Sequence, residues 1–170
     1  KACSNRLLRR KPCDRIQKRD PPMMFRLIAP ALIALAACST AVQAATYEMF
    51  RDPNCGCCEM WAEHVRTENE ADIAEVPTQD MAAIKTANGV PQDLWSCHTM
   101  IVGGYVIEGH VPAADIARLL AERPEGVEGL AVAGMPLGSP GMEAGNRKQA
   151  YQVIAFGKKG RSVFASYPGA

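Results

Sequence analysis

The chain has 170 residues, 48% hydrophobic and 22% charged, which indicates one globular domain with a leader or tail and excludes a disordered or low-complexity chain. The formal net charge of +1 conceals two opposite parts. Residues 1–26 carry nine Lys and Arg against two Asp (+7), whereas residues 45–170 carry ten Lys and Arg against 16 Asp and Glu (−6). Because the body is acidic and only 6% of residues are aromatic, we expect no nucleic-acid partner.

The N-terminal region has the pattern of a secretory signal peptide. An apolar run of eleven residues, 27–37, follows Arg26 and is about half as long as a membrane-spanning helix. Small residues follow the run, as at a cleavage site. We expect residues 1–22 to be an upstream extension outside the working protein, residues 23–44 to be the signal peptide, and residues 45–170 to be the exported domain.

Two cleavage sites compete in this leader. Val42-Gln43-Ala44, before Ala45, fits the small-x-small rule of ordinary signal peptidase and predicts a soluble periplasmic protein, which is slightly favoured. Leu35-Ala36-Ala37-Cys38 resembles a bacterial lipobox, in which Cys38 is lipidated. Only the second reading predicts contact with a membrane, as a lipid-anchored protein of the envelope.

Hydrophobic periodicity and turn residues predict an α/β domain. Strands are expected at residues 47–51, 73–76, 99–102 and 105–108, and helices at 58–68, 81–87 and 113–122. The order β-α-β-α-β-β-α is that of a thioredoxin-like fold. A Gly/Pro-rich loop at residues 126–145 and a hairpin of strands 151–156 and 162–167 are expected to follow.

The body has four cysteines, and three of them lie within four residues: Cys55, Cys57 and Cys58. An exported protein meets an oxidising environment, so structural disulfides are the default expectation. A cross-link that closes so short a loop stabilises a fold little. The clustering therefore favours thiol–disulfide exchange or binding of a soft metal.

Cys55 and Cys58 form a C-x-x-C pair at the expected start of a helix, where residues one turn apart share a face. The helix dipole lowers thiol pKa values there. If the site is redox-active, Cys55 is the predicted nucleophile and Cys58 the resolving thiol. Cys57 lies about 100° from Cys58 around the helix, so it is expected to join only from the side.

Cys97 and His98 come just before the third strand, at a position that faces the helix cysteines in thioredoxin-like folds and normally holds a cis-proline. A thiol and an imidazole at this position suit Cu(I), with zinc as the competitor. His98 has the alternative role of a hydrogen-bonded strand residue. His110, between a strand and a helix, is a candidate ligand or a surface cap.

The remaining candidates carry weaker signals. Met135 and Met142 on the Gly/Pro loop are either Cu(I) thioethers or anchors that pack on the core. His64 on the first helix is expected to face solvent. Trp61 and Trp95 are expected in the core.

Four motifs in order resemble a bacterial domain-of-unknown-function family that includes the CopG copper-resistance proteins. They are Cys55-Gly56-Cys57-Cys58, Ser96-Cys97-His98-Thr99, the segment Tyr105–Pro112 and the segment Gly134–Glu143. The resemblance covers about residues 47–167. It implies a periplasmic thioredoxin-like fold, copper binding through the C-x-C-C motif and the downstream cysteine, a role in copper tolerance, and redox handling of copper.

Three functions are compatible with these patterns. The favoured one is a periplasmic copper-binding protein that holds Cu(I) on Cys55, Cys57, Cys58 and Cys97, with His98 and His110 as further metal candidates. Its expected partners are copper ions and other periplasmic copper-handling proteins. The alternative is a periplasmic thiol–disulfide oxidoreductase with Cys55 and Cys58 as catalytic residues. The third is a structural zinc or disulfide module without turnover.

Overall fold

The structure, a computed structural model, describes residues 46–170. The expected extension, the signal peptide and Cys38 lie outside these residues. Within the described part, no helix is both long enough and apolar enough to cross a membrane.

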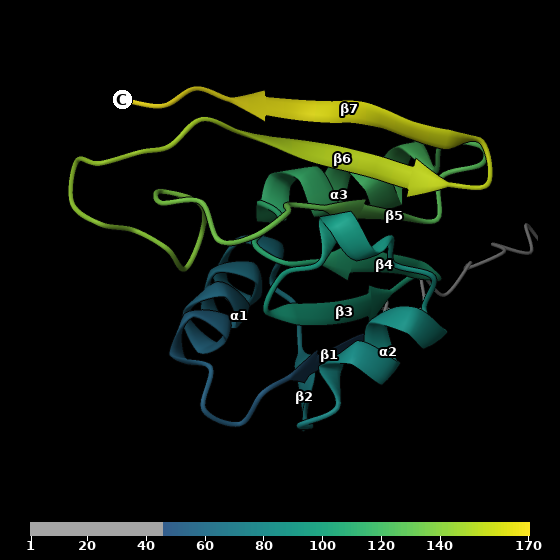
Figure 1. Cartoon of the computed structure of the whole chain (residues 1–170), viewed down its shortest axis with the longest axis horizontal. Helices are drawn as coiled ribbons and strands as arrows, with labels where there is room; N and C mark the ends of the chain where they lie inside the picture. Colours follow the sequence, from purple (N-terminus) through teal and green to yellow (C-terminus); the bar gives the residue numbers. More distant parts are fainter. Residues whose placement is uncertain (1–45) are drawn as a thin grey trace, which may run out of the picture. The chain divides into compact units, whose positions relative to one another are not determined.

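The described residues form seven strands, three α-helices and one short 3-10 helix (Figure 1). The strands are β1 (Tyr47–Arg51), β2 (Ile73–Pro77), β3 (His98–Val102), β4 (Tyr105–Glu108), β5 (Gly129–Ala131), β6 (Tyr151–Gly157) and β7 (Gly160–Tyr167). The helices are α1 (Gly56–Asn69), α2 (Met81–Ala87), α3 (Ala113–Glu122) and the 3-10 helix η1 (Gln92–Leu94).

All seven strands belong to one mixed sheet in the order β2-β1-β3-β4-β5-β6-β7. β1 pairs in parallel with β2 and antiparallel with β3, and β3 and β4 form the expected hairpin. Arg51, the last residue of β1, is opposite His98, the first residue of β3. This register places the chain that enters α1 beside the chain that enters β3.

The sheet has one strand more than predicted. β5 lies in the segment expected to be an irregular loop, and it joins β4 in parallel and β6 antiparallel, so the C-terminal hairpin extends the main sheet. Its three residues, Gly129-Leu130-Ala131, are all buried and show no alternation. Their partners lie 23 to 27 residues away in the chain on either side, so no local pattern predicts the strand.

The core lies on both faces of the sheet, because alternate residues of a strand point to opposite sides. One face packs against α1 and α3, which contact each other, while α2 packs on β1 and β3. The core consists of two hydrophobic clusters, and adjacent residues of β4, β5 and β6 belong to different clusters. The first cluster contains Ile107, Leu130 and Ala155, and the second contains Val106, Ala131 and Phe156. Trp61 is completely buried in the first cluster, as predicted, and Trp95 packs against the second.

Candidate metal centre

Four cysteine sulfurs meet where β1 leads into α1 and η1 leads into β3. α1 begins at Gly56, two residues before the predicted start, so Cys55 is its N-cap and Cys57 and Cys58 lie in its first turn. The antiparallel pairing of β1 with β3 brings Cys97 to the same point. The Sγ atoms of Cys55, Cys57, Cys58 and Cys97 all lie within 4.8 Å of one another.

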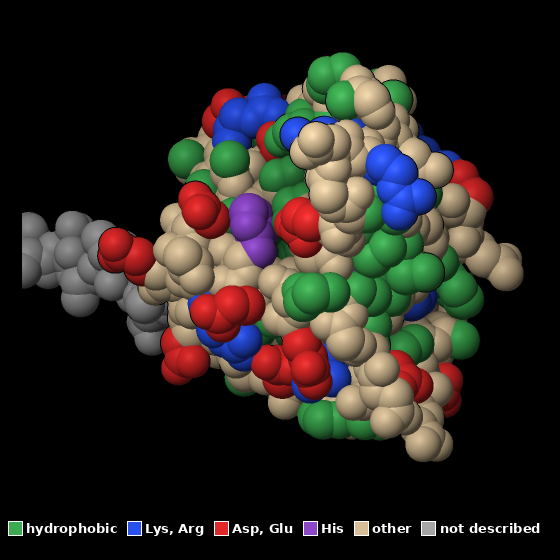
Figure 2. Space-filling model, turned by 90° about the vertical axis from the view of Figure 1, so that its left-hand side faces the viewer, with side chains coloured by type: hydrophobic (Ala, Val, Ile, Leu, Met, Phe, Trp, Pro, Cys, Tyr) green, Lys and Arg blue, Asp and Glu red, His purple; other side chains and the backbone are tan. Residues whose placement is uncertain are grey.

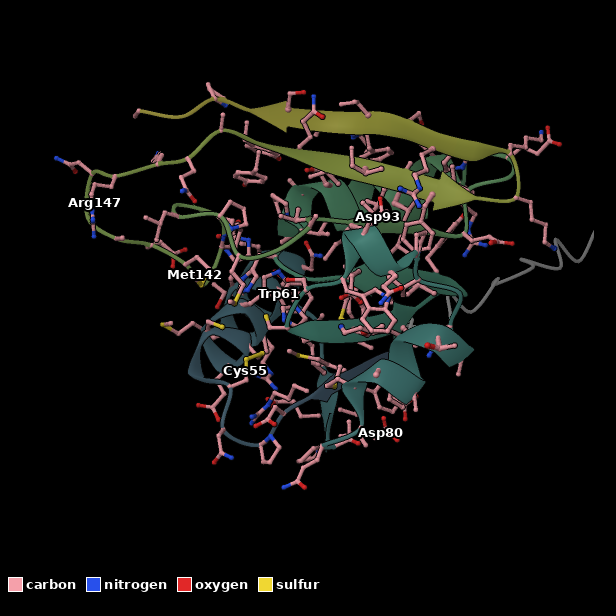
Figure 3. The ribbon with its side chains drawn as sticks, viewed as in Figure 1. Cys55, Trp61, Asp80, Asp93, Met142 and Arg147 are labelled. Carbon is pink, nitrogen blue, oxygen red and sulfur yellow. A yellow bond between two sulfur atoms is a disulfide. The ribbon has the colours of Figure 1, made fainter. Side chains whose placement is uncertain are left out.

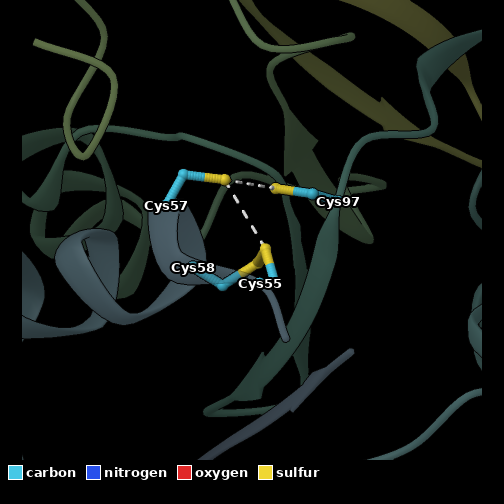
Figure 4. Close-up of side chains that lie close together, drawn as sticks. All are labelled: Cys55, Cys57, Cys58 and Cys97. Carbon is cyan, nitrogen blue, oxygen red and sulfur yellow. Dashed lines mark hydrogen bonds between the residues drawn. A yellow bond between two sulfur atoms is a disulfide. The ribbon is translucent and has the colours of Figure 1, made fainter. Parts of the chain in front are cut away.

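Cys55 and Cys58 are joined by a disulfide, with Cα atoms 5.3 Å apart (Figure 4). Cys57 and Cys97 are free thiols. The Sγ of Cys57 is 3.5 Å from that of Cys55 and 3.9 Å from that of Cys97, so it lies between the disulfide and the β3 segment. The structure therefore shows an oxidised pair beside a reduced pair, and Cys57 links the two.

Two buried imidazoles extend the cluster on the side of Cys97. The Sγ of Cys97 is 3.0 Å from Nε2 of His110 and 3.3 Å from Nδ1 of His98. These three residues also form a group whose ligand atoms lie within 4.8 Å of one another. His110 is completely buried, so the alternative of a surface cap is wrong.

The neighbours of each imidazole define what its nitrogens can do. Nδ1 of His110 lies 2.8 Å from the carbonyl oxygen of Pro140, which can only accept, so Nδ1 carries the proton and Nε2 presents a lone pair to Cys97. A ring nitrogen fixed in this way is typical of metal-binding histidines. Nε2 of His98 is buried and has no hydrogen-bond partner among the described residues.

Burial controls the protonation of this cluster. It raises the pKa of Cys97 to about 12, with a further contribution from Cys57. It lowers the pKa of His98 well below its usual value, helped by His110 and Lys85, and it also lowers that of His110. Neutral imidazoles are the form that binds metals, and the proton of Cys97 must leave when a metal binds. The set of sulfur and imidazole donors, in which Cys58 and both histidines are buried and the other cysteines are half-buried, fits a soft cation.

The Gly/Pro loop packs beside this cluster, and Figure 3 shows Met142 above α1 near Trp61. Pro140 contacts His110 through its carbonyl, and Gly141 lies directly on the backbone of α1. Internal hydrogen bonds hold the loop in shape, including those from the Met142 N–H to the Ser139 oxygen and from the Gly138 N–H to the Met142 oxygen. The long loop is thus ordered and packs against His110 and the first turns of α1.

Other candidate residues lie on the Gly/Pro loop and on the neighbouring helices and strands. Met142 is half-buried, while the side chain of Met135 is 51% exposed. Met60 of α1, which the sequence did not single out as a candidate ligand, is 56% exposed. Nε2 of His64 accepts a hydrogen bond from the Ala113 N–H and caps α3, so this histidine does more than face solvent. Lys85 and Glu108, buried below the site, were also missed by the sequence reasoning.

Figure 2 shows the face on which α1 and the Gly/Pro loop lie. Acidic side chains are the most numerous charged groups on this face, with Lys and Arg among them. Together with the net charge of −6 on residues 45–170, this distribution favours the approach of a cation.

Comparison with known proteins agrees with the geometry. Residues 94–142 match the family described as "Protein of unknown function, DUF411". Two solved structures of copper resistance protein CopG, form 1 and form 2, are each 44% identical to the chain. They cover 75% and 74% of this chain and 100% of their own, with TM-scores of 0.70 and 0.69.

The chain belongs to the DUF411 family, which includes CopG. The family match spans Cys97, His98, His110 and the Gly/Pro loop up to Met142, and so contains the histidine side of the cluster. No curated protein matches the chain by sequence.

Proposed function

We propose that this protein is a periplasmic copper-binding protein of copper resistance, with Cu(I) held by the thiolates of Cys55, Cys57, Cys58 and Cys97. The observation that carries the proposal is the convergence of four cysteine sulfurs and two buried histidines from α1, β3 and the segment before α3. The likeness to copper resistance protein CopG supports copper as the ion.

The donor set favours Cu(I) over zinc. Zinc sites in proteins are almost always tetrahedral, with four donors. Here six candidate donors lie close together, and Cys97 belongs to both groups of them. Sulfur atoms that are shared between neighbouring groups suit a small thiolate-bridged cluster of a soft monovalent ion.

The fold and compartment belong to the same proposal. The first four strands lie in the order β2-β1-β3-β4, and β1 with β2 is the one parallel pair among them. This arrangement supports a thioredoxin-like core for residues 47–122. The apolar run before the small residues of the leader supports export to the periplasm, with lipid anchoring through Cys38 as the variant. Copper ions and other periplasmic copper-handling proteins are the proposed partners.

A redox role is the second function that the site supports, because Cys55 and Cys58 are joined. In the reduced protein, their two thiols can give two electrons to two Cu(II) ions. The products are one disulfide, two Cu(I) ions and two protons. This reaction converts copper to the form that the remaining thiolates prefer.

The first test is anaerobic titration of the reduced, metal-free protein with Cu(I), with a competing chelator and metal analysis. We expect bound copper to slow alkylation of all four body cysteines together, because thiolates committed to a metal are not free to attack. Alkylation rates that are unchanged by one or more equivalents of Cu(I) would show that these cysteines are not the site. Zinc under the same conditions is the control for metal preference.

The disulfide gives a further prediction. Within residues 46–170, the oxidised protein has only Cys57 and Cys97 as free thiols, so it is expected to bind less Cu(I) than reduced protein. Reduction of the Cys55–Cys58 disulfide should restore the full stoichiometry. Metal analysis of both forms after gel filtration measures the difference, and equal copper contents would exclude Cys55 and Cys58 as ligands.

A further inference from the structure

A buried ion pair lies on the side of the sheet that faces α2. Nζ of Lys85, on α2, is 2.5 Å from Oε1 of Glu108, at the end of β4. Thr99 on β3 completes the group: its hydroxyl is 3.1 Å from the ammonium and donates to Oε2 of Glu108 at 2.7 Å. The side chain of Glu108 is completely buried and that of Lys85 is 4% exposed.

The carboxylate of Glu108 also reaches the segment that carries Cys97. The backbone N–H of Ser96 donates to Oε1 of Glu108 at 2.6 Å. The backbone beyond Glu108 joins the same segment, because the Gly109 N–H donates to the His98 oxygen at 3.0 Å. Glu108 therefore connects the α2 side of the sheet with the residue directly before Cys97.

Ser96 is held from a second direction by the backbone of the Gly/Pro loop. Its hydroxyl donates to the Gly134 oxygen, and the Gly134 N–H donates to the Trp95 oxygen at 3.3 Å. Gly109 also lies against it: a Cβ added at Gly109 would be 2.5 Å from the side chain of Ser96. Glu108 and Gly134 thus hold both the N–H and the carbonyl of the Trp95–Ser96 peptide, one residue before Cys97, which leaves this peptide little freedom to turn.

Stability alone does not explain an ion pair at this place. Burial removes water from both charges, and well-packed apolar residues of similar size often stabilise a protein as much or more. An apolar pair would, however, give the N–H of Ser96 no acceptor. Glu108 is needed because its carboxylate fixes the direction of this N–H, and the direction of the N–H in turn sets the direction of the Cys97 side chain.

We propose that Glu108, held in place by Lys85 and Thr99, is a positioning residue that fixes the Trp95–Ser96 peptide and so points the Cys97 sulfur, on the next residue, at Cys57 and His110. Its effect on copper rests on the proposed function. Its effect on the reactivity of Cys97 in the metal-free protein does not.

Two double variants of the full chain test the proposal as a matched pair. Both replace Lys85 by Met and so remove the buried cation. Lys85→Met with Glu108→Gln keeps a side-chain oxygen that can accept from Ser96 and places an amide NH2, which can donate to the Thr99 hydroxyl, at the second position. Lys85→Met with Glu108→Leu keeps no acceptor. The ratio of Cys97 to Cys57 alkylation rates, measured by mass spectrometry in metal-free protein, and the Cu(I) affinity are the two readouts.

We expect the Gln variant to stay within about twofold of the wild type in both readouts. In the Leu variant we expect at least a tenfold change in the alkylation ratio and at least a tenfold loss of Cu(I) affinity. Val65→Ala, a cavity variant in α1 away from this group, controls for loss of stability. Equal values for the Gln and Leu variants, or the same changes in Val65→Ala, would overturn the proposal.

Should the Leu variant not fold, Thr99→Val takes its place, because it removes one donor to the carboxylate without changing any charge. We then expect a smaller shift of the alkylation ratio in Thr99→Val, and an unshifted ratio overturns the proposal. If the wild type itself binds no copper, the proposed function fails. The alkylation ratio still decides whether Glu108 positions Cys97.

Discussion

Replacing Cys97 by Ser is expected to lower the copper content or the Cu(I) affinity markedly, by about tenfold or more, while the metal-free fold survives. Cu(I) prefers thiolate to hydroxyl, so Ser cannot replace the donor that the residue before β3 contributes. The fold tolerates the change because Nε2 of His110, 3.0 Å from the sulfur, can accept a hydrogen bond from a hydroxyl at this position. Copper per protein and Cu(I) competition measure the loss.

The same variant separates the metal site from the oxidoreductase. Disulfide exchange needs only the attacking and the resolving thiol, so Cys97→Ser would leave exchange rates nearly intact. Copper should raise the melting temperature of the wild type more than that of Cys97→Ser, because binding stabilises only the state that binds. Unchanged copper binding in Cys97→Ser, together with lost reductase activity in Cys55→Ser, would contradict the proposed copper site and favour the oxidoreductase.

Gly141→Ala is expected to detach the Gly/Pro loop from α1. The residue has a φ of +76°, and an added Cβ would be 2.7 Å from the Cys57 oxygen and 2.7 Å from the Trp61 nitrogen. Both are helix backbone atoms that cannot move aside alone. The loop must lift instead, which breaks the contact of Pro140 with His110. We expect a loss of about 3 kcal/mol in unfolding free energy, as in overpacked cores, and weaker Cu(I) binding.

Gly145→Ala is the matched control for this variant. Its φ is +62°, close to that of Gly141, but nothing lies within 4 Å of an added Cβ. Both variants therefore share the cost of a left-handed backbone, about 1–2 kcal/mol, and only Gly141→Ala adds the contact with α1. Denaturant unfolding and Cu(I) competition compare the two. If they lose the same stability and affinity, contact between loop and helix does not support the site.

Local sequence determined the helices and most strands of the described domain. α2 and α3 lie at the predicted residues, because their boundaries rest on neighbouring side chains. Oδ1 of Asp80 accepts from the Ala83 N–H at the start of α2, and prolines flank α3. The shared face of Cys55 and Cys58 also follows from helix geometry alone, and the disulfide joins these two residues.

Tertiary structure decided how the site is assembled and what surrounds it. β5 forms only because α3 returns the chain to the edge of β4, and three buried residues carry no period from which to predict it. The role of Glu108 is equally hidden. A glutamate in a strand is an ordinary surface residue until α2 supplies Lys85 and the end of η1 supplies the N–H of Ser96. The sequence shows which residues carry the donor atoms. The distances between these atoms, however, depend on the pairing of β1 with β3 and on the loop that packs on α1. These contacts join residues 47 to 84 positions apart, where local propensity has no influence.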